Sequence, residues 1–183
     1  MNILKNPVIA IFLCVLIVLS STVISINVKL NNKCQEIVDS FYVAKSNSST
    51  SIYGDIVSMY ELAEEIIVVA DNYGIDTRKL TSSLSSLKNE VNFNNPEIDD
   101  IYEAYSAFYN ELWDVELKLS EIQLSQRHME YMNGAAKQVF ELKTSIDNAE
   151  YNNTVITFYK RFDRFPVNIF ADIFDIDYPE YFA

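Results

Sequence analysis

The sequence predicts an all-α protein: an elongated antiparallel bundle of three to four long helices behind one N-terminal transmembrane helix. Three observations support this fold class. The 183 residues include only three glycines and four prolines, which supply many of the turns that a sheet protein needs. Apolar residues recur at steps of three and four over long stretches, which is typical of packed helices. An uncharged apolar run near the start of the chain is long enough for a membrane span.

The apolar run covers residues 7–28, after a short segment of residues 1–6, and holds no charge between Lys5 and Lys29. As a helix it would extend about 33 Å, enough for a hydrocarbon layer of about 30 Å. A cleaved signal peptide is one alternative, although its apolar region is usually shorter. A buried soluble helix is another, although it would show a polar face. We expect a transmembrane helix. Its orientation is nearly undecided, because the positive charges of Lys5 and the amino terminus on one side of the span are balanced by those of Lys29 and Lys33 on the other.

Residues 29–51 are expected to be a juxtamembrane segment or the start of the first long helix. Within them, residues 45–51 (KSNSSTS) are poor in strong helix formers. They form either a short linker or a weak, exposed part of one long helix that continues from the membrane. The helical bundle is then expected over residues 52–165. Its first apolar stripe ends at Gly74, a natural C-terminal cap position, and consists of Ile52, Ile56, Met59, Ala63, Ile66, Ala70 and Tyr73.

A short helix around Leu80, Leu84 and Leu87 is expected next, closed by the loop VNFNNP. The clearest helix of the bundle follows, with Asn95 as its cap, Pro96 at its first position and an end near Ser125. Its stripe alternates steps of three and four without a miss: Ile98, Ile101, Tyr105, Phe108, Leu112, Val115, Leu119 and Ile122. Such a long, unbroken stripe favours coiled-coil-like packing against neighbouring helices.

The last long helix is expected to carry two stripes in succession. The first consists of Met132, Ala135, Val139, Leu142, Ile146 and Ala149, and the second of Tyr151, Val155, Phe158, Phe162 and Phe165. The change of phase indicates that the final turns face a different neighbour. Pro166 is expected to stop or bend this helix. The aromatic segment of residues 166–183 would then turn back and pack on the bundle.

The net charge of −12 is uneven, because residues 34–183 hold 11 basic and 26 acidic residues, a net of −15. Such a body would be repelled by nucleic acid and by anionic lipid headgroups. Cys14 lies in the apolar run, so a disulfide to Cys34 is not expected. Both Asn47 and Asn152 begin glycosylation sequons, which matter only in a secretory lumen.

The sequence contains no motif for catalysis, cofactor binding or metal binding. We therefore predict no catalytic, cofactor-binding or metal-binding residue. His128 is the single histidine, too few for the Glu-x-x-His pairs of metal sites in bundles. Gly-x-Ser-x-Gly elbows and phosphate-binding loops are missing from the sequence. Neighbouring carboxylates are expected to be solvated surface, namely Glu64 with Glu65, Asp99 with Asp100, and Asp175 with Asp177.

The C-terminal segment of residues 151–183 resembles the signature of the LemA family. That signature has Tyr-Asn, an aliphatic residue, an aromatic–polar pair, Phe-Pro, an Asn-aliphatic-x-Ala step and a closing Tyr-Phe. Its places are filled in order by Tyr151-Asn152, Val155, Phe158, Phe165-Pro166, Asn168-Ile169, Ala171 and Tyr181-Phe182. The family's second Tyr-Asn is replaced by Phe158-Tyr159, and its late glycine step by Asp175-Ile176.

The N-terminal half of the chain resembles the family in the order of its elements. Where the family has Asp-Leu-Ile-Pro-Asn-Leu-Val, this chain has the run ELAEEII of residues 61–67, followed by Tyr73. Proline and asparagine are replaced by Glu64 and Glu65, which places any function of that segment in doubt here. The chain thus looks like a divergent member of the LemA family.

The resemblance implies a single membrane anchor, an all-helical body in the cytoplasm and no established enzymatic activity. We therefore expect a non-catalytic scaffold or adaptor, a single-pass membrane protein that presents an acidic bundle to an unidentified protein partner. A self-associating structural membrane protein, hence a homo-oligomer, and an accessory subunit of a membrane enzyme are the alternatives. Neither nucleic acid nor a cofactor is expected to bind.

Overall fold

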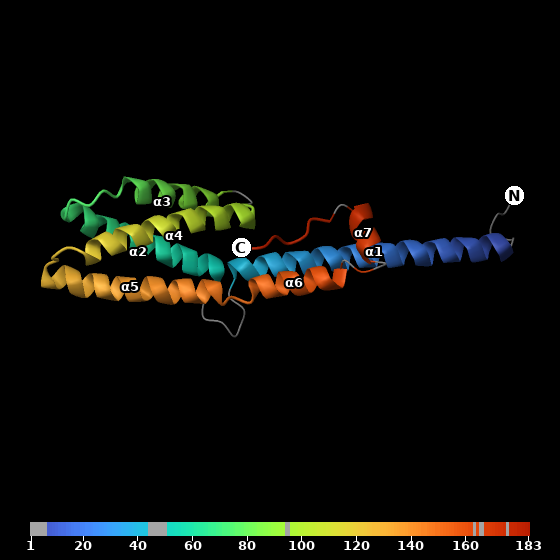
Figure 1. Ribbon diagram of the computed structural model, residues 1–183. Coiled ribbons are helices and arrows are strands. Elements are labelled where there is room, and N and C mark those ends of the chain that lie inside the picture. Colours follow the sequence, from blue (N-terminus) through green and yellow to red (C-terminus); the bar gives the residue numbers. More distant parts are fainter. Residues whose placement is uncertain (1–6, 44–50, 94–95, 163, 165–166, 175) are drawn as a thin grey trace. The chain divides into compact units, whose positions relative to one another are not determined.

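The computed structural model describes residues 7–43, 51–93, 96–162, 164, 167–174 and 176–183, and its regular secondary structure is α-helical, with no strand in these ranges. Figure 1 shows the helices in the order of the chain. They are α1 (Pro7–Tyr42), α2 (Ile52–Asn72), α3 (Arg78–Val91), α4 (Ile98–Ser120), α5 (Gln126–Asp147), α6 (Tyr151–Phe162) and α7 (Val167–Phe174). The predicted all-α fold class is confirmed.

The chain folds into two compact units. The α1 unit contains residues 1–38 and 155–179, and the bundle unit contains residues 39–154 and 180–183. Most of α1 therefore groups with the second half of α6 and with α7, whereas helices α2 to α5 form a separate core.

Helices α2 to α5 pack as an antiparallel bundle, in which the closest pairs are α3 with α4 and α2 with α5. Contacts at both ends of α2 establish the direction of α5. Near the start of α2, Asp55 contacts Ser145 at the end of α5. After the end of α2, Tyr73 contacts Ser125, the N-terminal cap of α5. The stripes predicted from the sequence therefore meet in one core between these four helices.

The core confirms the predicted stripes with few exceptions. All stripe residues from Ile52 to Ala70, the three leucines of α3 and the α4 stripe from Ile98 to Leu119 are buried. Ile122 is exposed because α4 ends at Ser120, two residues before it and earlier than predicted. Tyr73 is half-buried because it is the C-terminal cap residue of α2.

The predicted end of α2 is confirmed at Gly74, which has a φ of 73°. This left-handed conformation favours glycine because a Cβ atom would be strained there. The Gly74 amide donates to the Asp71 carbonyl at 3.1 Å, and the Ile75 amide donates to the Ala70 carbonyl at 3.1 Å. These two bonds form the Schellman arrangement that satisfies the last carbonyls of a helix.

Besides the end of α4, two predicted helix boundaries are wrong. α4 begins at Ile98 rather than at Pro96, and the predicted cap Asn95 lies outside the described residues. The last long helix is in fact two helices, because α5 ends at Asp147 and α6 begins at Tyr151. The phase change between Ala149 and Tyr151 thus marks a break in the helix, since a step of two residues cannot continue a helical stripe.

α1 continues well past the predicted transmembrane stretch of residues 7–28 and ends only at Tyr42, four residues after the first segment of the α1 unit ends at Val38. α1 is long and apolar enough to cross a membrane, and its most apolar part is not buried within the protein. Its buried side chains begin later, at Leu30, Cys34 and Ile37. α6 contributes Val155 and Phe158 to the same compact unit. The linker prediction for residues 45–51 concerns residues that are mostly outside the described ranges, apart from Ser51.

The C-terminal segment packs only in part as predicted. Phe182 is buried in the bundle unit, whereas the buried residues Ile176 and Pro179 belong to the α1 unit rather than to the bundle. By contrast, Ile169, Ile173 and Tyr181 of the same segment are exposed. Ile169 and Ile173 are exposed because they share one side of α7, a separate short helix in the α1 unit. The predicted stop at Pro166, the stripe residue Phe165 and the Phe170 side chain lie outside the described residues.

The last four residues of the bundle unit, 180–183, form hydrogen bonds with Tyr151 and Asn152. We call this arrangement the C-terminal clasp. Asn152 accepts from the Phe182 amide at 2.9 Å and donates to the Phe182 carbonyl at 2.6 Å. The Tyr151 hydroxyl donates to the Glu180 carbonyl at 2.7 Å. The Phe182 ring lies 5.1 to 5.7 Å from the rings of three aromatic residues, Phe41, Tyr102 and Tyr105.

Glu180 of the clasp also caps α4. Its Oε2 atom accepts from the Ile98 amide at 2.8 Å and from the Asp99 amide at 3.3 Å. The first amides of a helix have no partner within the helix, and a carboxylate there also interacts favourably with the helix dipole. The cap that the sequence places at Asn95 is thus supplied by a residue from the opposite end of the chain.

Candidate functional site

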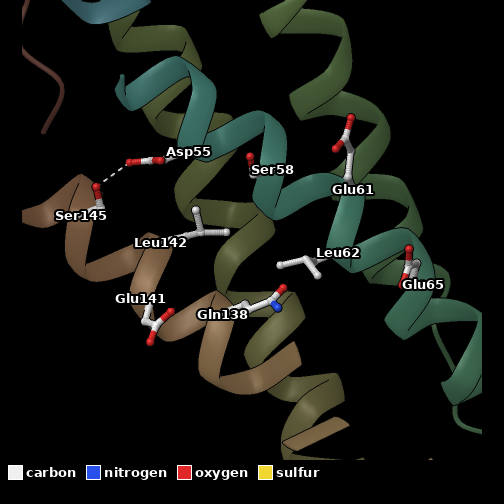
Figure 2. A pocket seen from close by; sticks show the side chains of 9 residues that line it. All are labelled: Asp55, Ser58, Glu61, Leu62, Glu65, Gln138, Glu141, Leu142 and Ser145. Carbon is white, nitrogen blue, oxygen red and sulfur yellow. Dashed lines mark hydrogen bonds between the residues drawn. The ribbon is translucent and has the colours of Figure 1, made fainter. Parts of the chain in front are cut away.

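The candidate site is a groove between α2 and α5, which we call the acidic groove (Figure 2). Its volume is about 530 Å³. The lining side chains are Asp55, Ser58, Glu61, Leu62, Glu65, Gln138, Glu141, Leu142 and Ser145. All of them belong to the bundle unit, in which 21 acidic residues outnumber eight basic ones, a net charge of −13.

Helical spacing explains why these side chains converge. On α2, Ser58, Glu61, Leu62 and Glu65 recur at three and four residues, directly beside the buried stripe that includes Met59 and Ala63. The lining residues of α5 repeat the same spacing from Gln138 to Ser145. Positions three and four apart share one face of a helix. The two helices therefore present facing rows of polar residues along the edge of the core.

Asp55 forms the deep end of the groove. It is 2% exposed, and the Ser145 hydroxyl donates to its Oδ2 atom at 2.6 Å, as Figure 2 shows. A buried carboxylate is costly unless it has such partners. Asp55 also lies in the first turn of α2, where the helix dipole favours negative charge. The Asp55 side chain is thus held in place by Ser145 of α5, and its negative charge is stabilised by the dipole of α2.

Glu65 lies toward the other end of the groove and is fixed by α5. The Tyr131 hydroxyl donates to Glu65 Oε2 at 2.6 Å. Burial raises the pKa of Tyr131 well above its ordinary value, and this hydrogen bond to a carboxylate is the second largest cause. Tyr131 therefore keeps its proton at neutral pH and remains the donor.

The remaining carboxylates of the groove are more exposed. Glu141 pairs with Lys137 one turn away at 3.6 Å. Glu61 is exposed, and no described residue forms an ion pair or hydrogen bond with its side chain. Leu62 and Leu142 add apolar surface between the acidic residues (Figure 2). The groove thus combines four carboxylates with apolar walls.

This arrangement can accept hydrogen bonds from cationic groups. Ionised carboxylates are acceptors only, and their bonds to Lys and Arg are strong. Long basic side chains also have apolar stems that pack on surfaces such as Leu62 and Leu142. Among the described residues, no group of three or more His, Cys, Asp or Glu side chains could hold a metal ion.

The polar residues singled out from the sequence do not gather in this groove, with the exception of Glu65. Its neighbour Glu64 points to α3 and pairs with Lys88. His128 has a partner, since its Nδ1 atom lies 3.0 Å from the Tyr73 hydroxyl. Asp99 and Asp100 are exposed at the start of α4. Of the last pair, Asp177 is exposed, and Asp175 lies outside the described residues.

The two cysteines are free, as expected: Cys14 is exposed and Cys34 is buried. Burial is the main reason why the pKa of the Cys34 thiol is raised to about 11, with the nearby Asp177 carboxylate as a smaller cause. Asn152, which the sequence marks as a sequon residue and as part of the LemA-like signature, holds the C-terminal clasp.

The sequence contained one signal for the groove that the prediction did not use. Glu61 and Glu65 are one turn apart beside the α2 stripe, as are Glu141 and Ser145 beside the α5 stripe. Edge positions of this kind line the seam between two antiparallel helices. The pairing of α2 with α5 was missing, because the sequence does not say which helices are neighbours.

Comparison with models of known families, with curated proteins and with solved structures finds no match.

Proposed function

We propose that this protein is a membrane-tethered helical scaffold, similar to LemA proteins, whose acidic groove binds a basic segment of a protein partner. The observation that carries this proposal is the groove itself, where four carboxylates from two helices converge with one neighbouring lysine. A site of this chemistry selects for positive charge and repels nucleic acid.

The groove suits a few basic side chains rather than a small neutral ligand. Its volume is about 530 Å³, and its lining is mainly polar and acidic. Lys or Arg residues of a partner would place their charged ends near Glu61 and Glu141, with their stems on Leu62 and Leu142. Three residues that line the groove, Glu61, Leu62 and Glu65, also belong to the segment that resembles the LemA family.

The proposed tether is α1, whose apolar stretch is long enough to cross a bilayer and is exposed. The body is proposed to be cytoplasmic, as the family resemblance implies. Tethering would concentrate the groove at one membrane, which raises the effective concentration toward partners on the same surface.

The test compares the full-length protein in native membranes with two triple variants. Glu61→Gln/Glu65→Gln/Glu141→Gln neutralises the groove and retains hydrogen-bond acceptors. Asp100→Asn/Glu103→Gln/Glu121→Gln changes the net charge equally at exposed positions outside the groove. Each variant is isolated with its partners, which are quantified by mass spectrometry.

We expect a partner that is recovered with the wild-type and control proteins and is depleted roughly tenfold with the groove variant, since each exposed pair contributes about 0.2–1 kcal/mol. The partner's binding segment should be basic. Equal recovery of every protein with both triple variants would contradict the role of the groove.

Self-association is a second candidate, favoured by one observation. Trp113 and Leu117 of α4 are both exposed although they are large and apolar, and they lie one turn apart on the same face. Trp is enriched among residues that dominate protein interfaces. Sedimentation of the full chain in detergent, alongside a Trp113→Ser/Leu117→Ser variant, tests this. A dimer that dissociates in the variant supports it, and a monomeric wild-type protein at high concentration excludes it.

A further inference from the structure

The walls of the acidic groove restrict the conformation of a peptide that binds there. Both walls are sides of continuous helices, since the lining residues run from Asp55 to Glu65 on α2 and from Gln138 to Ser145 on α5. At a rise of about 1.5 Å per residue, the longer wall extends about 15 Å, or nearly three helical turns. The groove is therefore long enough for a short peptide segment, and not only for a single side chain.

The backbone of the walls offers no hydrogen-bond donor to such a segment. The amides of the lining residues donate within α2 and α5, and the amide of Asp55 donates to the Ser51 carbonyl at 2.9 Å. In the ranges that the structure describes there is also no strand whose edge could pair with an added strand. An extended peptide usually gains its affinity from such main-chain bonds, and it would find none here.

The side chains of the groove are almost entirely acceptors. Ionised carboxylates cannot donate a hydrogen bond. The Ser58 hydroxyl donates to the Gly54 carbonyl at 2.9 Å, and the Ser145 hydroxyl donates to Asp55 at 2.6 Å. Among the nine lining side chains, the Gln138 amide is therefore the one that still has a donor. Peptide carbonyls buried in the groove would lack partners, which is costly unless they are bonded within their own helix.

The distribution of charged and apolar side chains across the groove also fits a helix. Figure 2 shows Leu62 and Leu142 between the carboxylates of the two walls, Glu61 on α2 and Glu141 on α5. A helix presents a central row of side chains with one flanking row on each side, as in a coiled coil. A strand alternates its side chains between two faces. It would therefore contact the leucines either with a single row of side chains or with its polar backbone.

The carboxylates on both walls are available to cations. Glu61 forms no ion pair or hydrogen bond with a described residue. Glu141 pairs with Lys137 at 3.6 Å, and both side chains are exposed, so this pair contributes little and is readily exchanged. Asp55 and Glu65 each accept from a hydroxyl group and retain further acceptor capacity. A bound segment therefore needs basic residues on both of its flanks.

We propose that the acidic groove binds a basic amphipathic helix of a protein partner. An apolar residue of this helix covers Leu62 and Leu142. Lysine or arginine residues on its two flanks pair with Glu61 and Glu65 on one side and with Glu141 on the other. The inference rests on the proposed function, and it adds the conformation and the residue pattern of the segment that binds. It is argued from charge complementarity and from the lack of donors in the groove.

The test uses the full chain in nanodiscs of phosphatidylcholine, a lipid without net charge. Random peptides of about 16 residues, long enough to span the groove as a helix, are displayed on phage and selected on the wild-type protein. Peptides that also bind the groove variant Glu61→Gln/Glu65→Gln/Glu141→Gln are removed. The enriched peptides are then compared on the charge-matched control Asp100→Asn/Glu103→Gln/Glu121→Gln.

We expect the enriched peptides to repeat apolar residues at steps of three and four, with lysine or arginine on both flanks and without a central proline. They should bind the control as they bind wild type. In the tightest peptide, proline at a central, solvent-facing position should weaken binding about a hundredfold by calorimetry, whereas alanine there should have little effect.

Two results would overturn this inference, and they differ in what they leave standing. Basic peptides that require the groove but tolerate the central proline would exclude the helix and leave the proposed function intact. If no peptide distinguishes the wild-type protein from the groove variant, the proposed function fails together with the inference.

Discussion

Replacing Phe182 by alanine should destabilise the bundle unit more than any other single change in the C-terminal segment. Phe182 is 5% exposed. Its ring contacts Phe41, Tyr102 and Tyr105, and its backbone makes both hydrogen bonds to Asn152. The substitution removes the ring and leaves the backbone bonds possible, so it isolates the contribution of packing.

The expected magnitude follows from this burial. Replacing a buried Phe by Ala costs about 3–5 kcal/mol, which combines lost transfer free energy and a cavity. A domain has a total free energy of unfolding of about 5–15 kcal/mol, so the loss would be a large part of it. The melting temperature should fall by about 10 °C or more. Phe182→Leu keeps most of the apolar volume and should cost about 1.5 kcal/mol or less.

The assay is urea unfolding of the full chain in a mild detergent, followed by far-UV circular dichroism. Phe140→Ala is the matched control, because Phe140 of α5 is 68% exposed, and a surface change should stay within about 0.5 kcal/mol. Equal stabilities of Phe182→Ala and Phe140→Ala would show that the C-terminal clasp does not hold the bundle, and the reasoning about the tail would be refuted.

Three other predictions concern single groups. Glu180→Ala should lower stability by about 1 kcal/mol through loss of the cap on Ile98, whereas Glu180→Gln keeps an acceptor and should lower it less; equal urea midpoints for Glu180→Ala and wild type would refute the cap. Burial raises the pKa of Glu116 to about 7 from 4.5, so its contribution to stability is complete below about pH 4.5 and is lost as the pH rises through 7. The free energy of unfolding of Glu116→Gln, relative to that of wild type, should therefore be about 1–2 kcal/mol higher at pH 8 than at pH 4.5, after allowance for partial exposure. A difference between the two proteins that does not change with pH would contradict this. Because the pKa of Cys34 is raised to about 11, iodoacetamide at pH 8 should alkylate it roughly a hundredfold more slowly in the folded protein than in urea; equal rates by mass spectrometry would show that the thiol is not buried.

The helices of the bundle were largely predictable because each has a regular apolar stripe. In α4, the stripe predicted from Ile98 to Ile122 is buried except at Ile122, which lies beyond the end of the helix. The end of α2 was predictable from Gly74, because a left-handed residue after a helix has a strong preference for glycine. Local sequence determines both features, so neither depends on knowing the neighbouring helices.

Features that depend on distant residues were not predictable. Glu180 caps α4 across 82 positions of sequence, and Ser145 satisfies Asp55 across 90. No local pattern pairs such residues. The break between α5 and α6 was visible as a two-residue step after Ala149, but it was interpreted as a change of neighbour. The acidic groove was not predicted because its residues are also distant in sequence. Its two walls form a site only when α2 lies beside α5.

The most direct test of the account is the state of the mature protein in membranes that have been washed at alkaline pH. Mass spectrometry of the protein that remains in the washed membranes should recover the peptide that covers residues 7–28, because α1 holds the chain in the bilayer. Recovery of a mature chain that begins after Ser21, in the soluble fraction, would contradict the tether on which the proposed scaffold depends.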